Sequence, residues 1–294
     1  MNFQWKGISM AQMSPEEIIE QQRQDWSRVA PAWEKWDALL HRNLSFLNYR
    51  LVGDARIRPG QRVLDLGSGT GYPAIVAADA AGNEGEVLGL DLSEEMLDRA
   101  KRKAYGLGLF QLDFRVADVT HLSEADHSFD AVISRFCLMF LPDVAKAVGE
   151  IARVMKPGGY FAAAVWSGPD QNPFVKIPVD VLKRFIEIPQ PPPDQPGIFR
   201  LAKPGDLSGM AEKAGLRKLT DEEIQAESFY DSPETYWTNL IDMAAPLQPL
   251  FAKLSSKDRG EAERQIKEAV EPYRRGEEIA LPMAIRIVVA RKPS

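Results

Sequence analysis

Between Arg62 and Trp166 the sequence alternates short, apolar, β-branched runs with segments of helical character. The runs read RVLDLG, GEVLGLDL, DFRVADV, FDAVISRF and GYFAAAVW. Between them, EEMLDRAKRKAYGLG has the pattern of an amphipathic helix closed by glycine, and DVAKAVGEIARVMKPGG that of a helix stopped by Pro157 and Gly158. Strands that alternate with helices form a parallel sheet covered on both faces. The alternation therefore predicts an α/β fold.

The segments that flank this alternation are mainly helical. From Ser14 to about residue 52 the chain is rich in Trp, Gln and Glu, and Trp26, Trp33 and Trp36 recur at helical spacing. A helical block with internal prolines lies between about 232 and 278, and LPMAIRIVVARKP closes the chain as an apolar strand. The stretch IEIPQPPPDQPGIF is too rich in proline for a helix or central strand, and predicts an irregular surface connection. We therefore predict four regions: a helical flap over 1–55, a core over 56–230, a helical insertion over 231–280 and a last core strand over 281–294.

Charge and cysteine content limit the partners and the compartment. The formal net charge of -6 gives no basic excess for binding a phosphate backbone, so we do not expect nucleic acid as a partner. Cys137 is the single cysteine, which suits a reducing compartment, and we expect the cytoplasm. The N-terminal residues lack a signal-peptide pattern, and no apolar run approaches the roughly 20 residues of a membrane-spanning helix. The oligomeric state is left open.

A glycine-rich turn joins the first apolar run to a helix that begins near Tyr72. The stretch VLDLGSGTGY places Gly67, Gly69 and Gly71 where a strand turns sharply, and glycine allows positive φ and close approach of a ligand there. A dinucleotide fingerprint would have its third glycine where Tyr72 stands. A P-loop would need a lysine followed by Ser or Thr, which is absent. The turn alone therefore leaves its ligand open.

Three carboxylates stand at the ends of the first three runs. Asp65 lies beside the turn, where a carboxylate disfavours a pyrophosphate and favours a ligand that is positive at this end. Asp91 can accept hydrogen bonds from both hydroxyls of a ribose. Asp118 can accept from an adenine amino group while Val119 packs on the ring. Because the carboxyl ends of parallel strands meet in one crevice, a sulfonium nucleoside that carries an ammonium group fits these charges.

This set of motifs resembles the class I S-adenosylmethionine-dependent methyltransferases. The likeness runs from about Gly60 to Trp166, through VLDLGSGTG, GLDLSEEML, ADVTHL, FDAVISRFCLMFLPD and IARVMKPGGYFAAAVW. The resemblance is greatest to the small-molecule branch of ubiquinone and menaquinone biosynthesis. It implies a Rossmann-like, seven-stranded, mostly parallel sheet with helices on both faces, and S-adenosyl-L-methionine as the cofactor.

The resemblance also implies roles for single residues. Gly67 and Gly69 would contact the methionyl portion, and Ser134 and Arg135, at a strand end, would contact its methionine end. Met96 would lie near the adenosine, and the second and third acids would hold the ribose and the adenine. The predicted cofactor-binding residues are Asp65, Gly67, Ser68, Gly69, Gly71, Asp91, Leu92, Met96, Asp118, Val119, Ser134 and Arg135.

Residues outside this set are candidates for the reaction itself. His41, on the flap, is either a base suited to neutral pH or a surface or packed histidine. Trp33 either packs in the core or faces the sulfonium or an aromatic substrate. Trp166, Asn172 and Phe174 follow the fifth run and are placed for substrate contact. No group of His, Cys and acids has metal-ligand spacing, so we expect no metal.

The sequence thus predicts methyl transfer to a small, partly apolar molecule at O, C or N. A chain that binds the cofactor as a sensor or partner subunit without catalysis is an alternative. An NAD-dependent oxidoreductase is a further alternative, against which Tyr72 and Asp65 argue. Arg135 either contacts the ligand or pairs with a carboxylate such as Asp143.

Overall fold

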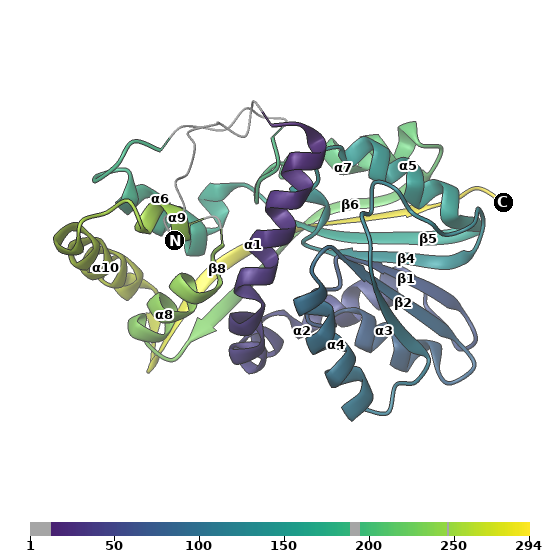
Figure 1. Ribbon diagram of the computed structural model, residues 1–294, viewed down its shortest axis with the longest axis horizontal. Helices are drawn as coiled ribbons and strands as arrows, with labels where there is room; N and C mark the ends of the chain where they lie inside the picture. Colours follow the sequence, from purple (N-terminus) through teal and green to yellow (C-terminus); the bar gives the residue numbers. More distant parts are fainter. Residues whose placement is uncertain (1–12, 189–194, 246) are drawn as a thin grey trace.

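The computed structural model describes residues 13–188, 195–245 and 247–294, and forms one sheet with helices on both faces (Figure 1). In Figure 1, α5 and α7 lie on one side of the sheet, and α2, α3 and α4 on the other. The helices are α1 (Pro15–Lys35), α2 (Asp37–Asp54), α3 (Ala74–Ala81), α4 (Glu94–Gly106), α5 (Val144–Val154), α6 (Pro173–Leu182), α7 (Asp206–Lys213), α8 (Pro233–Met243), α9 (Gln248–Phe251) and α10 (Ser256–Val270). The strands are β1 (Arg62–Leu66), β2 (Glu86–Asp91), β3 (Leu112–Val116), β4 (Phe129–Arg135), β5 (Met155–Trp166), β6 (Arg217–Tyr230), β7 (Arg274–Arg275) and β8 (Glu278–Arg291).

The sheet has the order β3-β2-β1-β4-β5-β8-β6. The first five strands of this order are parallel, and β8 runs antiparallel between β5 and β6. The strand order reverses between β1 and β4, and ligands of such sheets bind outside the carboxyl ends of the strands at this switch point. The predicted α/β fold with a mostly parallel sheet is confirmed.

Two details of the predicted fold are wrong. The described part of the sheet has eight strands rather than seven, because the short β7 folds back onto the start of β8 around Gly276, whose φ is 62°. The helix expected to stop at Pro157 and Gly158 ends earlier, at Val154. Met155 already pairs with Phe129 of β4, so Pro157 and Gly158 belong to β5.

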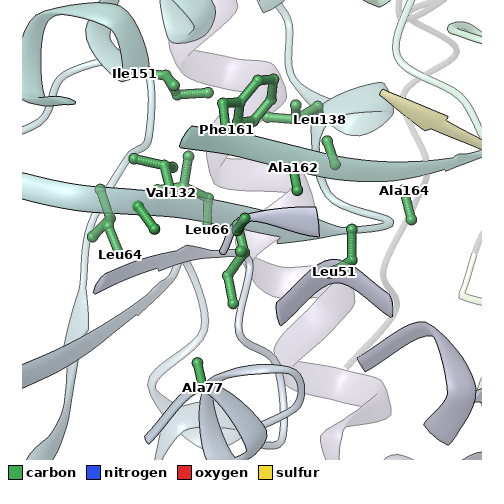
Figure 2. Packing of buried hydrophobic residues seen from close by; sticks show 14 of the residues in the cluster. Leu51, Leu64, Leu66, Ala77, Val132, Leu138, Ile151, Phe161, Ala162 and Ala164 are labelled. Carbon is green, nitrogen blue, oxygen red and sulfur yellow. The ribbon is translucent and has the colours of Figure 1, made fainter. Parts of the chain in front are cut away.

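The central strands are apolar on both faces because helices cover both (Figure 2). Leu64 and Leu66 on β1 and Val132 on β4 are fully buried. Figure 2 places Ala77 of α3 on one side of these strands and Ile151 of α5 on the other. Each fully buried aliphatic side chain contributes about 1.5–3 kcal/mol relative to exposure, so this double-sided core rigidly positions the strand ends.

The N-terminal helix α1 begins with a capping box. The side chain of Ser14 accepts the N–H of Glu17, and the Glu17 carboxylate accepts the N–H of Ser14. The helix then packs over the start of α4, where the Ser27 and Ser93 hydroxyl oxygens lie 3.0 Å apart. Met96 of α4 is buried against this helix. α1 therefore covers the junction between β2 and α4.

A second, smaller hydrophobic cluster joins α6, α8 and α10 to the start of β8. Tyr236 and Trp237 of α8 and Ile266 of α10 are buried in it. The helical insertion predicted before the last strand is thus present. Residues 189–194 of the predicted proline-rich connection lie outside the described residues. None of the described helices is long and apolar enough to cross a membrane.

Candidate active site

The glycine turn after β1 is shaped by a close contact with Cys137. Gly67 has a φ of 74°, and a Cβ at this position would lie 2.4 Å from the Cβ of Cys137. No larger residue fits without displacing that side chain. Gly71 ends the turn with a φ of 111°. Burial raises the pKa of the Cys137 thiol well above its usual range, so the thiol packs against the turn as a neutral group.

Asp91, at the end of β2, holds the same turn from the opposite side. One carboxylate oxygen accepts the N–H of Gly69 at 2.9 Å, and the other accepts the N–H of Ser93 at 2.9 Å. Ser93 in turn caps α4 by accepting the N–H of Met96 at 3.1 Å. A carboxylate offers about four acceptor sites, so Asp91 retains acceptor capacity for ligand hydroxyls. Burial raises its pKa.

Asp65 is fully buried at the end of β1. Its Oδ2 accepts the N–H of Ala74 at 3.2 Å, whereas Oδ1 is buried without a hydrogen-bond partner among the described residues. Burial raises the pKa of this carboxyl to about 7. A buried carboxyl with an unpartnered oxygen fits a cationic ligand group, because a positive partner offsets the desolvation of the charged form.

Arg135 and Ser134 end β4, the neighbouring strand. Arg135 donates to the side-chain oxygen of Asn48 on α2 at 2.7 Å, and burial lowers its pKa to about 10. It does not pair with Asp143, which instead caps α5 by accepting the N–H of Lys146 at 2.9 Å. Ser134 donates its hydroxyl to the carbonyl of Leu66 at 2.9 Å and so joins the ends of β4 and β1.

Asp118, in the loop after β3, closes a local turn. Its Oδ1 accepts the N–H of Thr120 at 2.8 Å, and Nδ1 of His121 lies 3.5 Å from its Oδ2. The side chain remains 26% exposed, so it can still reach a ligand. Of the other residues predicted to bind cofactor, Ser68, Met96 and Val119 are buried and Leu92 is half-buried. The fold thus brings the predicted set to the adjacent ends of β1, β2, β3 and β4.

A large cavity of about 1980 Å³ reaches Phe136, directly after β4, and Trp166, at the end of β5. Its described lining includes none of the predicted cofactor-binding residues. Its aromatic lining comes from α1, α6, α8, β6, the end of β5 and the segment after β4. The aromatic residues are Trp26, Trp33, Phe136, Phe140, Trp166, Phe174, Tyr230 and Tyr236. Three of the four residues predicted to contact substrate, Trp33, Trp166 and Phe174, are therefore in the cavity wall.

Asn172, the fourth, lies outside the cavity lining. Its amide nitrogen donates to the carbonyls of Ser167, Gly168 and Ala284, and its oxygen accepts the N–H of Ala284 at 3.0 Å. The side chain is fully buried and its hydrogen-bonding groups are occupied, so the structure gives it a structural role. Substrate contact by Asn172 stays a prediction, which this geometry does not favour.

His41 also lies outside the cavity lining. Its side chain is exposed on α2, and its ring centroid is 5.3 Å from that of Tyr72. Leu40 and Leu44, from the same helix, do line the cavity. The helical phase therefore turns His41 away from the chamber, in agreement with its interpretation as a surface histidine.

A stacked aromatic pair joins the strand ends to the cavity. Phe136 follows Arg135 directly, and its ring lies parallel to that of Trp166 with centroids 4.1 Å apart. Phe136 has a φ of 58°, which is uncommon for a bulky residue and is concentrated at functional sites. Phe136 is not among the residues predicted from the sequence, because a phenylalanine at the end of an apolar run carries no signal of its backbone conformation.

Comparisons with known proteins agree with this geometry. Residues 64–163 match a family described as a methyltransferase domain. The chain is 39% identical over 132 residues to a demethylmenaquinone methyltransferase of Bacillus cytotoxicus, covering 45% of this chain and 56% of that protein. It is 31% identical over 178 residues to the Bacillus cereus protein of the same name, covering 55% and 73%. The chain belongs to the class I S-adenosylmethionine-dependent methyltransferases.

A solved structure extends the likeness to most of the chain. A phosphoethanolamine N-methyltransferase of Haemonchus contortus, in complex with S-adenosylhomocysteine, superposes with a TM-score of 0.57 at 20% identity. The match covers 96% of this chain and 61% of that one, and it supports the methyltransferase fold. The chain spans less than two thirds of the length of several relatives that it matches, including the Bacillus cytotoxicus protein. Membership of the methyltransferase family, predicted from the motifs, is confirmed.

Proposed function

We propose that the protein transfers a methyl group from S-adenosyl-L-methionine to a small, partly apolar acceptor at O, C or N. The observation that carries this proposal is Asp65, a buried carboxyl at the end of β1 with one oxygen that has no hydrogen-bond partner among the described residues. The neighbouring strand β4 leads directly into Phe136, which lines a cavity walled by aromatic rings. The relatives named demethylmenaquinone methyltransferases support methylation of a small molecule.

The cofactor would be held by the acids at the strand ends. Asp65 would face its ammonium group, Asp91 would accept from the ribose hydroxyls, and Asp118 would accept from the adenine amino group, with Val119 against the ring. Met96, which is buried against α1, would close the part of the cofactor site that holds the adenosine. When bound, S-adenosyl-L-methionine supplies a methyl group activated by its sulfonium.

The contribution of the protein would be mainly to position the acceptor and exclude water. The stacked rings of Phe136 and Trp166 give the cavity an apolar surface next to the strand ends. Such a surface aligns reactants and keeps the positive sulfonium away from competing water. The described lining of the cavity contains no histidine, so we assign no base to His41 and expect the acceptor to ionise with its own pKa.

The same cavity supports the predicted division of the chain into a flap, a core, an insertion and a last strand. We propose that the flap (1–55) and the insertion (231–280) enclose the acceptor, because α1 contributes Trp26 and Trp33 and α8 contributes Tyr236 to the lining. The core (56–230) and the last strand (281–294) would hold the cofactor. The single cysteine and the net charge of -6 support a cytoplasmic enzyme that does not act on nucleic acid.

Calorimetry with purified protein tests the cofactor. We expect micromolar binding of S-adenosylmethionine and S-adenosylhomocysteine, no binding of NAD, and loss of binding in Asp91→Ala. Asp98→Ala is the matched control, since Asp98 is an exposed carboxylate on α4, the helix that begins just after Asp91. Binding of NAD alone, or of none of the three, would overturn the proposal.

Turnover must be measured separately from binding. Transfer of labelled methyl groups to a panel of hydroxylated and amine-bearing aromatic compounds would establish catalysis. Cofactor binding without transfer to any member of a broad panel would favour the sensor or partner-subunit function over the enzyme.

A further inference from the structure

One face of the extended strands β6 and β8 forms a wall of the cavity. Side chains of directly paired residues in antiparallel strands point to the same face, and this face recurs at every second residue. Trp166 pairs with Ile285 of β8, Met283 pairs with Ala226, Ser228 with Leu281, and Tyr230 with Ile279. Trp166, Met283, Ser228 and Tyr230 therefore share one face, and all four line the cavity.

This wall changes character along its length. It begins at Trp166, stacked on Phe136 beside the cofactor strand ends, and passes the apolar Met283. It ends at two hydroxyls, those of Ser228 and Tyr230. Along β8, the partners of Trp166 and Tyr230 are separated by six residues, or roughly 20 Å of strand. In Figure 1 both strands run on from the sheet toward α8.

The two hydroxyls are held in place by neighbouring groups. Asn43 of α2 donates to the Ser228 oxygen at 3.3 Å and to the carbonyl of Phe229 at 3.1 Å. Its own oxygen accepts the N–H of Phe229 at 2.9 Å. Because Ser228 accepts from Asn43, its hydroxyl proton points elsewhere and can serve a ligand or Tyr230. Asn43 thus acts as a positioning residue for this pair.

The adjacent tyrosine on α8 provides an internal comparison. Tyr236 packs edge-on against Tyr230, with ring centroids 5.1 Å apart, and both line the cavity. The Tyr236 hydroxyl donates to the carbonyl of Phe174 at 2.7 Å and so fixes α8 to α6. The Tyr230 hydroxyl has Ser228 as its neighbour instead, and burial raises its pKa, so it remains a neutral phenol.

We propose that Ser228 and Tyr230 are specificity residues that bind a distal oxygen of an elongated, uncharged acceptor. The apolar body of this acceptor would run along Met283 to Trp166, where its reactive end meets the cofactor. The charged residues of the described lining come from α1, from residues 170–183 and from Arg200, and none comes from β6 or β8. Two of them, Lys176 and Asp180, pair at 2.5 Å and are each about two-fifths exposed. The hydroxyl end of the chamber therefore favours a neutral group over an ionic one. This inference rests on the proposed function for its reactive end, but not for the binding of the distal oxygen.

Naphthalene compounds with a terminal hydroxyl on an alkyl chain test the proposal, because naphthalene is fluorescent and can pack against the aromatic wall formed by Trp166, Phe136 and Phe174. Binding would be followed by fluorescence anisotropy for chains of increasing length, each compared with the same alkylnaphthalene lacking the hydroxyl. We expect the hydroxyl to improve affinity about 3- to 10-fold at the chain lengths that reach Ser228 and Tyr230, and to give no gain on short chains.

Tyr230→Phe and Ser228→Ala should each reduce this gain, and the double variant should abolish it. Tyr236→Phe is the matched control and should retain the gain, because its hydroxyl serves Phe174. A gain that persists in the double variant, a gain independent of chain length, or no binding of either series by the wild type would overturn the proposal. S-adenosylhomocysteine affinity, measured on the same samples, separates failure of the cofactor proposal from failure of this one.

Discussion

Asp91 accepts the backbone N–H of Gly69 at 2.9 Å, so the acid predicted to hold the ribose also holds the glycine turn. The other oxygen of Asp91 accepts the N–H of Ser93, at the start of α4. Two segments predicted to contact the cofactor are therefore connected through a single half-buried carboxylate. A binding site fixed in this way loses little conformational freedom when its ligand arrives.

The contact between Gly67 and Cys137 predicts a large cost for a small substitution. Gly67→Ala would place a methyl group 2.4 Å from the Cβ of Cys137 and would impose a φ of 74° on alanine. We expect a loss of about 2–4 kcal/mol in the free energy of unfolding, from overpacking and the left-handed backbone together. Urea denaturation measures it.

Gly69→Ala serves as the control for Gly67→Ala. Gly69 also has positive φ, at 52°, but nothing lies within 4 Å of an added Cβ. Gly69→Ala should therefore lose only about 1–2 kcal/mol in the free energy of unfolding, from the left-handed backbone conformation alone. Equal losses at the two positions would show that the Cys137 contact does not matter.

The raised pKa of Asp65 predicts that cofactor binding depends on pH. The carboxyl is mostly protonated below about pH 7, the pKa that burial gives it, and only its ionised form attracts an ammonium group. The affinity for S-adenosylhomocysteine should therefore rise between about pH 6 and about pH 7.5. Calorimetry at several pH values should show this rise in affinity for the wild type. For Asp65→Asn the affinity should be weak and should not change with pH. A rise that survives in Asp65→Asn would assign the titration to another group.

The same group predicts the direction in which stability changes with pH. The pKa of Asp65 is about 7 in the folded protein and 3.8 for an ordinary aspartate, so the folded state binds the proton more tightly. Its contribution to the free energy of unfolding therefore falls as pH rises from about 4 to about 7. Asp65→Asn should remove this pH-dependent loss of stability. Thermal denaturation of the wild type and of Asp65→Asn, at several pH values in that range, measures the difference in stability.

The sequence predicts what depends on local pattern and misses what depends on packing. The strands, the glycine turn and the acids at strand ends follow from short apolar, β-branched runs, glycine spacing and the rules for parallel sheets. Asn172 and Phe174 are two residues apart, yet one is locked to the backbone of β8 and the other lines the cavity. Their difference is set by β8, more than a hundred residues later in the chain.

Helix phase explains a second feature that the sequence left open. His41 and Leu40 are neighbours on α2, but only Leu40 faces the cavity, because neighbours on a helix point about 100° apart. The sequence also gives no sign that Arg135 would meet Asn48, a contact between residues 87 positions apart. Such pairings are known only once the helix is docked on the sheet.

The environment of Cys137, a half-buried residue, predicts a thiol of low reactivity. The pKa of this group is raised and the side chain packs against Gly67, so little thiolate forms at neutral pH. Folded protein should react with iodoacetamide much more slowly than protein unfolded in urea, where the pKa is ordinary. Mass spectrometry follows the reaction, and modification at the same rate in both states would contradict the burial.

Asn172→Ala distinguishes the structural role of Asn172 from contact with substrate. The change would leave the carbonyls of Ser167 and Gly168 and both backbone groups of Ala284 without this partner, in a fully buried location. We expect a loss of about 2 kcal/mol or more in the free energy of unfolding, since each unsatisfied buried group costs about 1–3 kcal/mol. The affinity of the remaining folded protein for the naphthalene compounds should be unchanged. Phe174→Ala, two residues away in the cavity wall, should instead weaken their binding. If Asn172→Ala keeps its stability and loses the naphthalene compounds, then the side chain contacts ligands after all, and the hydrogen bonds to β8 are rearranged when a ligand binds.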